Sequence, residues 1–329
     1  MVRLSNDLVD NQAIMFITLR EYKDALRPSA LLCSPTPVLI GTAVALRQLF
    51  DQGLGPDVRF WLTALLCCLT AVFIHSTCNL ANDYFDGIRG TDEGRSSLSG
   101  AGADGSVPDL PRRGVAGGVE PRKVLLAAYL NILMACLSGL ILCWVTGHWW
   151  MILVGIFCLL GAWFYTGGKH PYGYRAMGEL SIMIFFGLVG VLATQYLETG
   201  SIDRHGFIGA LVGGLICIPV LEINNYRDID ADPLAGKYTL SSFIGAKGTL
   251  ILMGSCYALA VILGIVESWS LSGGSLATAW PRLLCLLPVL AMAVATTVAS
   301  CRNRFSRAFA LSGYTDLLTG FCWLGVCLL

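Results

Sequence analysis

Long apolar stretches recur along the whole chain, with little polar sequence between most of them. Each is about 20 residues long, which is the length that a helix needs to cross about 30 Å of hydrocarbon. Of the 329 residues, 55% are hydrophobic and 13% are charged, and the mean hydropathy is +0.66. One soluble core cannot hold that much apolar surface, so the pattern predicts an all-α integral membrane protein with about nine transmembrane helices. The predicted spans are residues 29–48, 59–81, 123–146, 148–165, 176–197, 206–225, 248–267, 281–300 and 308–328.

The basic residues are distributed unevenly between the two predicted membrane faces. Of the 22 Lys and Arg residues, those on the side opposite the N-terminal segment are only Arg47, Arg59, Arg204 and Arg282. The positive-inside rule therefore places the N-terminus in the cytoplasm and the C-terminus outside. We expect residues 1–28 to form a cytoplasmic or interfacial segment and residues 29–329 to form one transmembrane domain in the lipid bilayer. The net charge is zero, so the charge gives no indication of a nucleic-acid partner.

Thirteen cysteines are present, and nearly all of them fall inside the apolar spans. They do not form a paired Cys-x-x-Cys ligand set. Free cysteine is a well-buried residue type and is small enough to allow close helix packing. We therefore interpret these cysteines as apolar packing residues.

Two polar motifs occupy equivalent positions in the two halves of the chain. Asn82-x-x-x-Asp86 lies at the inner end of the second span, and Asn224-x-x-x-Asp228-x-x-x-Asp232 lies at the inner end of the sixth. On a helix, residues four apart share a face, so each motif predicts a polar stripe. Weak internal symmetry of this kind often locates a binding site between the halves of a membrane protein. We expect the two motifs to face each other across a central cavity that opens toward the cytoplasm.

Carboxylates at the edge of the hydrocarbon repel one another and are costly to bury, so they require a cation. Mg²⁺ takes oxygen ligands and completes its shell with water and phosphate oxygens. The alternative is that these acids only end helices and lie solvated among the lipid headgroups. Two matched clusters at equivalent positions make this alternative less plausible than a single cluster would. Transition-metal binding by these motifs is not expected, because no His or Cys accompanies the acids.

These motifs resemble the UbiA superfamily of intramembrane prenyltransferases, and within it the menaquinone branch. The resemblance covers residues 27–247 and rests on several segments in the same order and spacing. They are Asn82-Asp83-Tyr84-Phe85-Asp86, Gly90-Thr91-Asp92, Tyr165-Thr166-Gly167-Gly168, Pro171-Tyr172-Gly173-Tyr174, Gly178-Glu179, Asn224 to Asp232, and Gly236-Lys237-x-Thr239-Leu240. Position 90 is glycine where the commoner superfamily pattern has aspartate, and Asp92 follows two residues later. Menaquinone-type and vitamin K-type enzymes share that shift.

The resemblance implies a prenyl diphosphate donor, Mg²⁺ as cofactor, and 1,4-dihydroxy-2-naphthoate as the aromatic acceptor, whose carboxylate leaves as CO₂. Two Mg²⁺ ions and nearby cations would stabilise the leaving diphosphate. The implied metal ligands are Asp83, Asp86, Asp92, Asp228 and Asp232. The implied catalytic residues are Asp86, Asp228 and Lys237. The implied substrate-binding residues are Asn82, Asn224, Arg112, Arg113, Lys169, Tyr165, Tyr174, Arg175 and Arg227.

Several of these roles have an alternative that the sequence leaves open. Positive-inside topology alone predicts basic residues on this face, so each candidate cation could serve topology only. Three tyrosines between the fourth and fifth spans, Tyr165, Tyr172 and Tyr174, could stack on the acceptor ring or shield the cation, or could belong to the interfacial aromatic belt. Acids in apolar spans are functional candidates, and Glu179, Glu222 and Asp316 are such acids. We expect Glu222 to orient ligands of the second motif. We expect Asp316 to pair with a polar neighbour. His75 could line the cavity or pack between helices.

Two rival functions remain open from the sequence. The same chemistry could act on another aromatic acceptor, or the donor itself could be cyclised. A transporter would place its intramembrane acids near the midplane as relays, whereas both motifs here lie at helix ends on one membrane face, which favours the enzyme. The stretch Ser96–Val107, rich in Ser, Gly and Ala, is expected to be mobile and has no counterpart in the resemblance.

Overall fold

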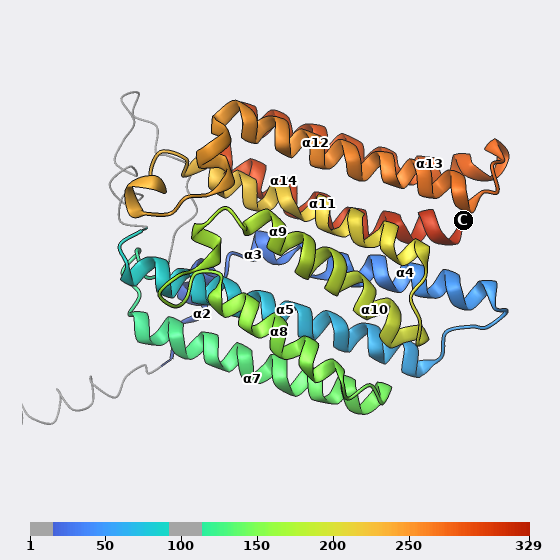
Figure 1. Cartoon of the computed structure of the whole chain (residues 1–329), viewed down its shortest axis with the longest axis horizontal. Helices are drawn as coiled ribbons and strands as arrows, with labels where there is room; N and C mark the ends of the chain where they lie inside the picture. Colours follow the sequence, from blue (N-terminus) through green and yellow to red (C-terminus); the bar gives the residue numbers. More distant parts are fainter. Residues whose placement is uncertain (1–15, 92–113) are drawn as a thin grey trace, which may run out of the picture.

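The computed structural model describes residues 16–91 and 114–329, and the described part is almost entirely helical (Figure 1). Its only β pairing is an isolated bridge between Arg175 and Tyr238. The helices are α2 (Leu19–Leu26), α3 (Pro28–Leu31), α4 (Pro35–Asp51), α5 (Val58–Ile88), α7 (Pro121–Thr146), α8 (Met151–Phe164), α9 (Gly178–Ile182), α10 (Gly190–Thr199), α11 (Arg204–Arg227), α12 (Leu240–Leu271), α13 (Leu276–Cys301) and α14 (Phe305–Leu328). Two short 3₁₀ helices, η1 (Tyr172–Tyr174) and η3 (Pro233–Ala235), lie in loops, and a π-helix, η2 (Met183–Val189), joins α9 to α10.

The membrane-spanning architecture is confirmed in the described residues. Eight helical stretches are long and apolar enough to cross a bilayer, and the shorter apolar helix α8 occupies the remaining predicted span. The bounds differ where polar residues continue a helix: α5 runs on to Ile88, and α12 begins at Leu240. Hydropathy marks where a helix leaves the hydrocarbon, whereas the backbone hydrogen bonds that define the helix continue beyond that point.

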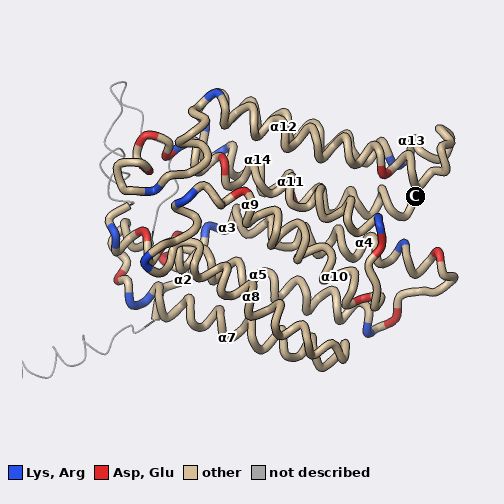
Figure 2. Tube along the Cα trace, in the orientation of Figure 1, with Lys and Arg blue, Asp and Glu red and all other residues tan. Residues whose placement is uncertain are grey.

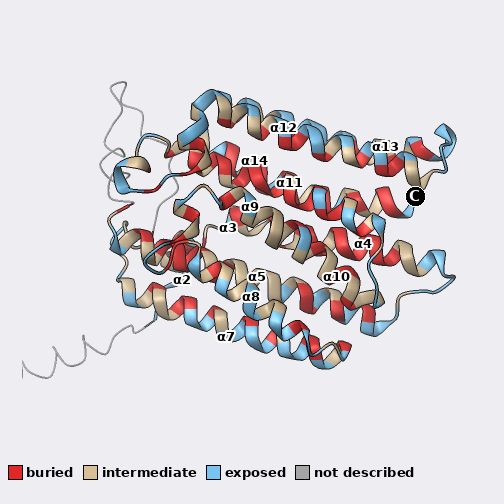
Figure 3. Cartoon of the chain, in the orientation of Figure 1, coloured by how far each residue is buried: buried red, intermediate tan, exposed pale blue. Residues whose placement is uncertain are grey.

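Two helices form the centre of the bundle. In α11 and in the span that contains α4, 72% of the most apolar window is buried, against 22% in α5. Ile40 and Val44 of α4, Ile216 of α11 and Trp323 of α14 pack into the main core. Figure 1 shows α12 and α13 along one edge and α7 and α8 along the opposite edge. Burial accordingly concentrates on the inner helix faces (Figure 3), and the exposed outer faces are apolar and suited to lipid.

Charged residues gather at the two ends of the bundle, and the long middle of each helix is nearly free of them (Figure 2). Both sequence motifs lie at the same end, which is hereafter called the motif end. At the opposite end, α5 and α11 each begin with an aspartate cap: Asp57 accepts a hydrogen bond from the Phe60 amide at 2.7 Å, and Asp203 accepts one from the Gly206 amide at 2.9 Å. These caps satisfy backbone donors that the helix itself leaves free.

The π-helix η2 packs closely against α11. A Cβ atom on Gly187 would lie 2.7 Å from the carbonyl oxygen of Ala210 and 3.2 Å from the Cα atom of Gly214. Only glycine permits that approach, because any side chain would separate the two backbones. This close packing holds η2 in place, and Phe185 and Phe186 of η2 line the internal cavity described below.

The described part of the N-terminal segment contains α2. Thr18 and Glu21 form a capping box at its start, and Ala25 and Leu26 at its end are buried beside Leu80 of α5. The predicted boundary between an N-terminal segment and the transmembrane domain at residue 28 stays a prediction.

Candidate active site at the motif end

The first motif lies on the last two turns of α5. Asn82, Asp83 and Asp86 are all buried. The second motif differs from the predicted helical stripe, because α11 ends at Arg227 and Asp228 is its C-cap. The chain then makes a turn in which the Asp232 amide donates to the Asp228 carbonyl at 2.8 Å. This turn keeps Asp228 and Asp232 buried at the same end of the bundle.

Asp86 is held by the loop between α8 and α9. The Tyr174 hydroxyl donates a hydrogen bond to Oδ1 of Asp86 at 2.7 Å and lies 3.1 Å from the Thr91 hydroxyl. Burial, and secondly the negative charge of Asp86, raise the pKa of Tyr174 above its ordinary value. The phenol therefore stays protonated and remains a donor to the carboxylate.

The same loop pairs with the segment that follows the second motif. The Tyr238 amide donates to the Tyr174 carbonyl at 3.0 Å, and the Ala176 amide donates to the Tyr238 carbonyl at 2.9 Å. Lys237 consequently lies above the Tyr174 ring, with Nζ 6.0 Å from the ring centroid. The loop between α8 and α9 therefore connects the first motif to the segment that follows the second, and so joins the two halves of the chain.

The second motif carries its own cations. Arg227 forms a two-pronged ion pair with Asp228, with nitrogen to oxygen distances of 2.8 and 2.7 Å. Lys237 Nζ lies 3.2 Å from Oδ2 of Asp232. Carboxylates and amide oxygens at one buried site match the ligands that Mg²⁺ prefers. The nearby cations match the needs of a diphosphate.

Asp83, predicted as a metal ligand, has backbone partners in the structure, and its role in metal binding stays a prediction. Its two carboxylate oxygens accept hydrogen bonds from the backbone amides of Gly114 and Val115, both at 2.9 Å. A Cβ atom on Gly114 would lie 2.6 Å from Oδ2 of Asp83, so the close approach depends on glycine. Asp83 thus anchors the chain where it returns toward α7, with each carboxylate oxygen accepting one backbone hydrogen bond.

Asn82 is positioned by the segment that follows α8. Its side-chain oxygen accepts a hydrogen bond from the Thr166 hydroxyl at 2.8 Å. Arg89 donates to the Thr166 carbonyl and, at 2.6 Å, to the Gly168 carbonyl, and its guanidinium stacks on the Phe85 and Tyr174 rings. Arg89 thereby fastens this segment to α5. Sequence reasoning counted Arg89 only as a basic residue of the loop.

The other predicted site residues fall into three groups. Asn224 and Tyr165 face the cavity described below, and the Tyr165 ring meets the Tyr172 ring edge-on at 5.4 Å. Lys169 and Arg175 are exposed, and the structure gives neither side chain a hydrogen bond or ion pair within the described residues. The predictions for Asp92, Arg112, Arg113 and the stretch Ser96–Val107 lie outside the described residues.

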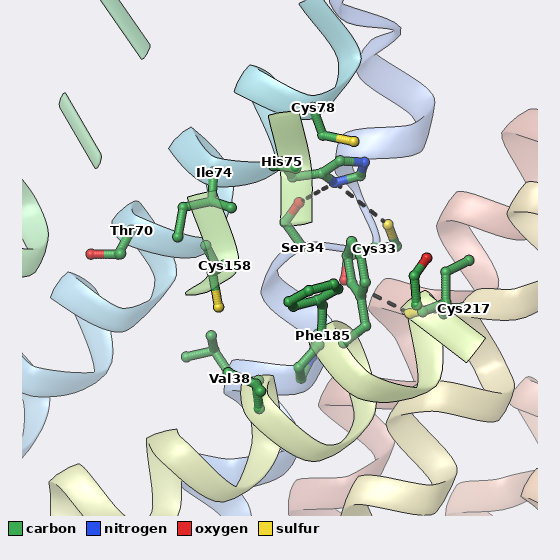
Figure 4. Close-up of a pocket in the computed structure, with 18 of the residues that line it drawn as sticks. Cys33, Ser34, Val38, Thr70, Ile74, His75, Cys78, Cys158, Phe185 and Cys217 are labelled. Carbon is green, nitrogen blue, oxygen red and sulfur yellow. Dashed lines mark hydrogen bonds between the residues drawn. The ribbon is translucent and has the colours of Figure 1, made fainter. Parts of the chain in front are cut away.

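An elongated cavity of about 290 Å³ begins at the two motif asparagines. Asn82 and Asn224 line its motif end, and Cys67 and Met151 line it near the opposite side of the bundle. From Asn82 to Cys67 the cavity follows α5 for four turns, or about 22 Å. Figure 4 shows the middle of this cavity, where His75 points inward among mostly apolar side chains. The arrangement suits a polar head group at one end and a long apolar chain below it.

Sequence reasoning missed two polar residues at this end of the cavity. Arg27 and Asn79 both line it, and Asn79 Nδ2 donates to the Leu26 carbonyl at 3.0 Å, which fixes the backbone just before Arg27. Arg27 takes a left-handed backbone conformation between α2 and α3. In the sequence, Arg27 stands immediately before the first span, where the positive-inside rule alone explains a basic residue. The left-handed turn that brings it to the cavity leaves no sequence signal.

Glu222 connects α11 to the start of α12. It accepts hydrogen bonds from Asn225 at 3.3 Å and from the Ser241 hydroxyl at 2.8 Å. These contacts support the interpretation that Glu222 orients the second motif, because they fix the helix turn that carries Asn224. His75 lines the cavity and lies 2.6 Å from the Ser34 hydroxyl through Nδ1.

Comparison with known proteins agrees with this geometry. Residues 35–314 match the model of the UbiA prenyltransferase family. The 1,4-dihydroxy-2-naphthoate octaprenyltransferase of Mycobacterium tuberculosis is 36% identical over 284 residues, which cover 86% of this chain and 87% of that protein.

Solved structures share the fold. A UbiA homologue from Aeropyrum pernix in its apo form aligns with a TM-score of 0.60 and 17% identity, covering 90% of this chain and 97% of that one. A UbiA homologue from Archaeoglobus fulgidus bound to GPP and Mg²⁺ aligns with a TM-score of 0.57 and 15% identity, covering 92% and 99% of the two chains. The chain therefore belongs to the UbiA prenyltransferase family and is an integral membrane prenyltransferase.

Proposed function

We propose that the protein transfers a polyprenyl group from a prenyl diphosphate to 1,4-dihydroxy-2-naphthoate, with Mg²⁺ as cofactor and loss of CO₂, in menaquinone biosynthesis. One observation carries the proposal: the asparagines of both motifs line the same end of one long apolar cavity, and the motif acids are buried at that end of the bundle. A prenyl diphosphate has the same two parts, a highly charged head and a long hydrocarbon tail.

The head group is assigned to the motif end. Asp86, Asp228 and Asp232 would hold Mg²⁺, which when bound neutralises the diphosphate and stabilises it as a leaving group. Tyr174 keeps one Asp86 oxygen in place through its 2.7 Å hydrogen bond. Arg227 and Lys237 pair with the acids in this structure and would exchange part of that pairing for phosphate oxygens. The Archaeoglobus relative, which shares the fold, was solved with GPP and Mg²⁺ bound.

The tail is assigned to the cavity below the motifs. Its walls supply apolar side chains such as Val38, Ile74 and Phe185, so a hydrocarbon chain would lose contact with water on binding. Tyr165 lies where the tail meets the head group and could shield an allylic cation with its ring. Excluding water there also protects that cation from hydrolysis.

The acceptor is inferred from the relative in Mycobacterium tuberculosis, whose name specifies 1,4-dihydroxy-2-naphthoate. Loss of a hydroxyl proton pushes charge onto the adjacent ring carbon, which can then attack an allylic cation without a strong protein base. The attacked carbon bears the carboxylate, whose departure as CO₂ restores the aromatic ring. The two motifs explain the donor, and the acceptor depends on this relationship.

The orientation is part of the proposal. Most basic residues of the described chain lie at the motif end (Figure 2). The positive-inside rule then directs the motif end and the active site toward the cytoplasm. Both substrates are charged, and they would reach the site from that side. Reaction of an impermeant cysteine reagent with a cysteine introduced at Lys169, in sealed right-side-out vesicles, would contradict this orientation.

The function is tested by giving the purified protein several prenyl diphosphates, Mg²⁺ and a panel of aromatic acids, and by identifying the products by mass spectrometry. We expect a decarboxylated prenyl naphthoquinol from 1,4-dihydroxy-2-naphthoate and little product from 4-hydroxybenzoate. Prenylation of 4-hydroxybenzoate alone would overturn the acceptor and keep the prenyltransferase. A cyclised donor formed without any acceptor would show that the site performs another reaction.

A further inference from the structure

A second cluster of ligand-type side chains lies in the wall of the cavity, away from the acidic motifs. It consists of Cys33 at the junction of α3 and α4, Cys217 on α11 and Asp316 on α14. One sulfur of each cysteine and one carboxylate oxygen of Asp316 all lie within 4.8 Å of one another. The three side chains come from distant parts of the chain and are 3%, 2% and 0% exposed. Figure 4 shows Cys33 and Cys217 side by side next to His75.

Asp316 is the unusual member of this cluster. Within the described residues, neither oxygen of its carboxylate has a hydrogen-bond partner, so the expectation that it pairs with a polar neighbour is wrong. A buried carboxylate without a partner is costly, and α14 could carry an apolar residue there without that cost. The side chain is directed at the two sulfur atoms, which are themselves ligands for a metal.

A fourth ligand is within reach. Nδ1 of His75 lies 3.7 Å from Sγ of Cys33. Two thiolates, a carboxylate and an imidazole are the ligand types of four-coordinate zinc sites. Mg²⁺, the ion proposed for the acidic motifs, prefers oxygen ligands only. The chemistry therefore distinguishes the two sites.

We propose that Cys33, Cys217 and Asp316 bind a zinc ion, with His75 as the fourth ligand. Ligand atoms at about 2.0–2.3 Å from zinc in a tetrahedron lie roughly 3.3–3.8 Å apart. The three atoms of Cys33, Cys217 and Asp316, which lie within 4.8 Å of one another, reach that spacing by side-chain rotations. His75 lies outside this group of three, and it would exchange its Ser34 contact for the zinc ion. Two thiolates and one carboxylate leave one negative charge on the complex, and their protons are released to water when zinc binds. Cys33, Cys217 and His75 line the cavity, which provides the route of entry.

The zinc ion would connect α4, α11 and α14, which meet at the centre of the bundle. Along α5, His75 lies two turns below Asn82, or about 10 Å, so the ion would sit beneath the proposed diphosphate site without touching its ligands. The inference does not depend on the proposed acceptor or on Mg²⁺. Its test can succeed or fail whatever the reaction is.

The first test measures zinc in the full-length protein, purified in detergent without chelators, by elemental mass spectrometry. We expect close to one zinc ion per chain in the wild type. The variants Cys33→Ser, Cys217→Ser and Asp316→Asn should each lose most of it. The control variants Cys136→Ser and Cys301→Ser change exposed cysteines on α7 and α13 and should keep it. Wild-type zinc content in Cys33→Ser and Asp316→Asn would overturn the proposal.

The second test uses only the wild-type chain, so it does not depend on whether a variant folds. Protein replaced with Co²⁺ should show the thiolate charge-transfer band and the visible bands of a tetrahedral cobalt site. A zinc chelator should increase alkylation of Cys33 and Cys217, read by peptide mass spectrometry, and leave that of Cys136 unchanged. Absence of cobalt bands together with full alkylation before chelation would contradict the proposal. So would a disulfide between Cys33 and Cys217 in the protein as purified.

Discussion

The hydroxyl oxygen of Tyr174 lies 2.7 Å from Oδ1 of Asp86, although the two residues belong to segments separated by two membrane-spanning helices. The Tyr174 backbone pairs at the same time with Tyr238, just after the second motif. One residue of the loop between α8 and α9 thus contacts the first motif through its side chain, and the segment after the second motif through its backbone. The alignment of Asp86 with the opposing acids therefore depends on this loop.

Replacing Tyr174 with Phe removes the donor and keeps the ring. A hydrogen bond to a charged group contributes about 1.5–3 kcal/mol, so we expect turnover to fall by about 10- to 100-fold, with the Mg²⁺ requirement shifted to higher concentration. Steady-state rates over a Mg²⁺ titration measure both effects. Tyr314→Phe, which changes an exposed phenol on α14, is the matched control and should behave as wild type. Unchanged kinetics of Tyr174→Phe would show that its hydrogen bond does not position Asp86.

Replacing Asp86 or Asp228 with Asn keeps the shape of the side chain and removes its charge. Each should lower turnover at least about a thousandfold, since metal-assisted stabilisation of the leaving group is worth several kcal/mol. The protein should still insert and elute as a single species from size-exclusion chromatography. Asp51→Asn alters an exposed acid at the opposite end of α4 and should retain full activity. Excess EDTA should reproduce the Asp86→Asn result with wild-type protein, and full activity in EDTA would reject a divalent-metal mechanism.

Asp83 is expected to affect stability more than metal binding. Asp83→Ala removes two charge-assisted hydrogen bonds to the backbone, each worth about 1.5–3 kcal/mol. Its thermal unfolding temperature should fall while the Mg²⁺ dependence of the remaining activity stays as in wild type.

Gly114→Ala tests the same contact from its other side, because the added Cβ would lie 2.6 Å from the Asp83 carboxylate. It should reproduce the loss of thermal stability. Gly55→Ala, where nothing lies within 4 Å of the added Cβ, is its control. A large change in Mg²⁺ affinity in Asp83→Ala would instead restore Asp83 as a metal ligand.

The cavity should limit the donor by length. Ala71 lines it three turns below Asn82, about 16 Å along α5, so Ala71→Trp fills the part that only a long tail reaches. We expect activity with long polyprenyl diphosphates to fall at least tenfold and activity with geranyl diphosphate to change little. Competition assays with mixed donors measure the preference. Ala291→Trp, on an exposed face of α13, should leave the preference unchanged, and equal losses for both donors in Ala71→Trp would place the tail elsewhere.

The sequence predicted the helices well because hydropathy over about 20 residues reports directly on the membrane. It also selected Asn82, Asp86, Asn224 and Asp228 as candidate site residues, since polar groups with helical spacing at the end of an apolar span are conspicuous. The end of α11 at Arg227 was not predictable in the same way. A polar motif with a spacing of four fits both a continued helix and the turn that the chain makes.

Other features of the site required the folded chain. Asp83 and Asp86 have the same chemistry in the sequence, and only the return of Gly114 toward α5 gives Asp83 a different partner. In the sequence, Cys33 and Cys217 read as ordinary packing residues, and Asp316 stands out only as an acid in an apolar span, with no motif around it. Their proximity arises because α4, α11 and α14 pack together at the centre of the bundle. Such convergence of distant segments has no local pattern in the sequence.

Decarboxylating prenyl transfer is measured with purified protein, Mg²⁺, a polyprenyl diphosphate and 1,4-dihydroxy-2-naphthoate labelled at the carboxylate carbon. Labelled CO₂ and prenylated product are measured over time in the same reaction. We expect them to form in equal amounts, and neither to form without the donor or in the Asp86→Asn protein. Prenylated product that keeps the labelled carbon, or no prenylated product from this acceptor, would contradict the proposed reaction.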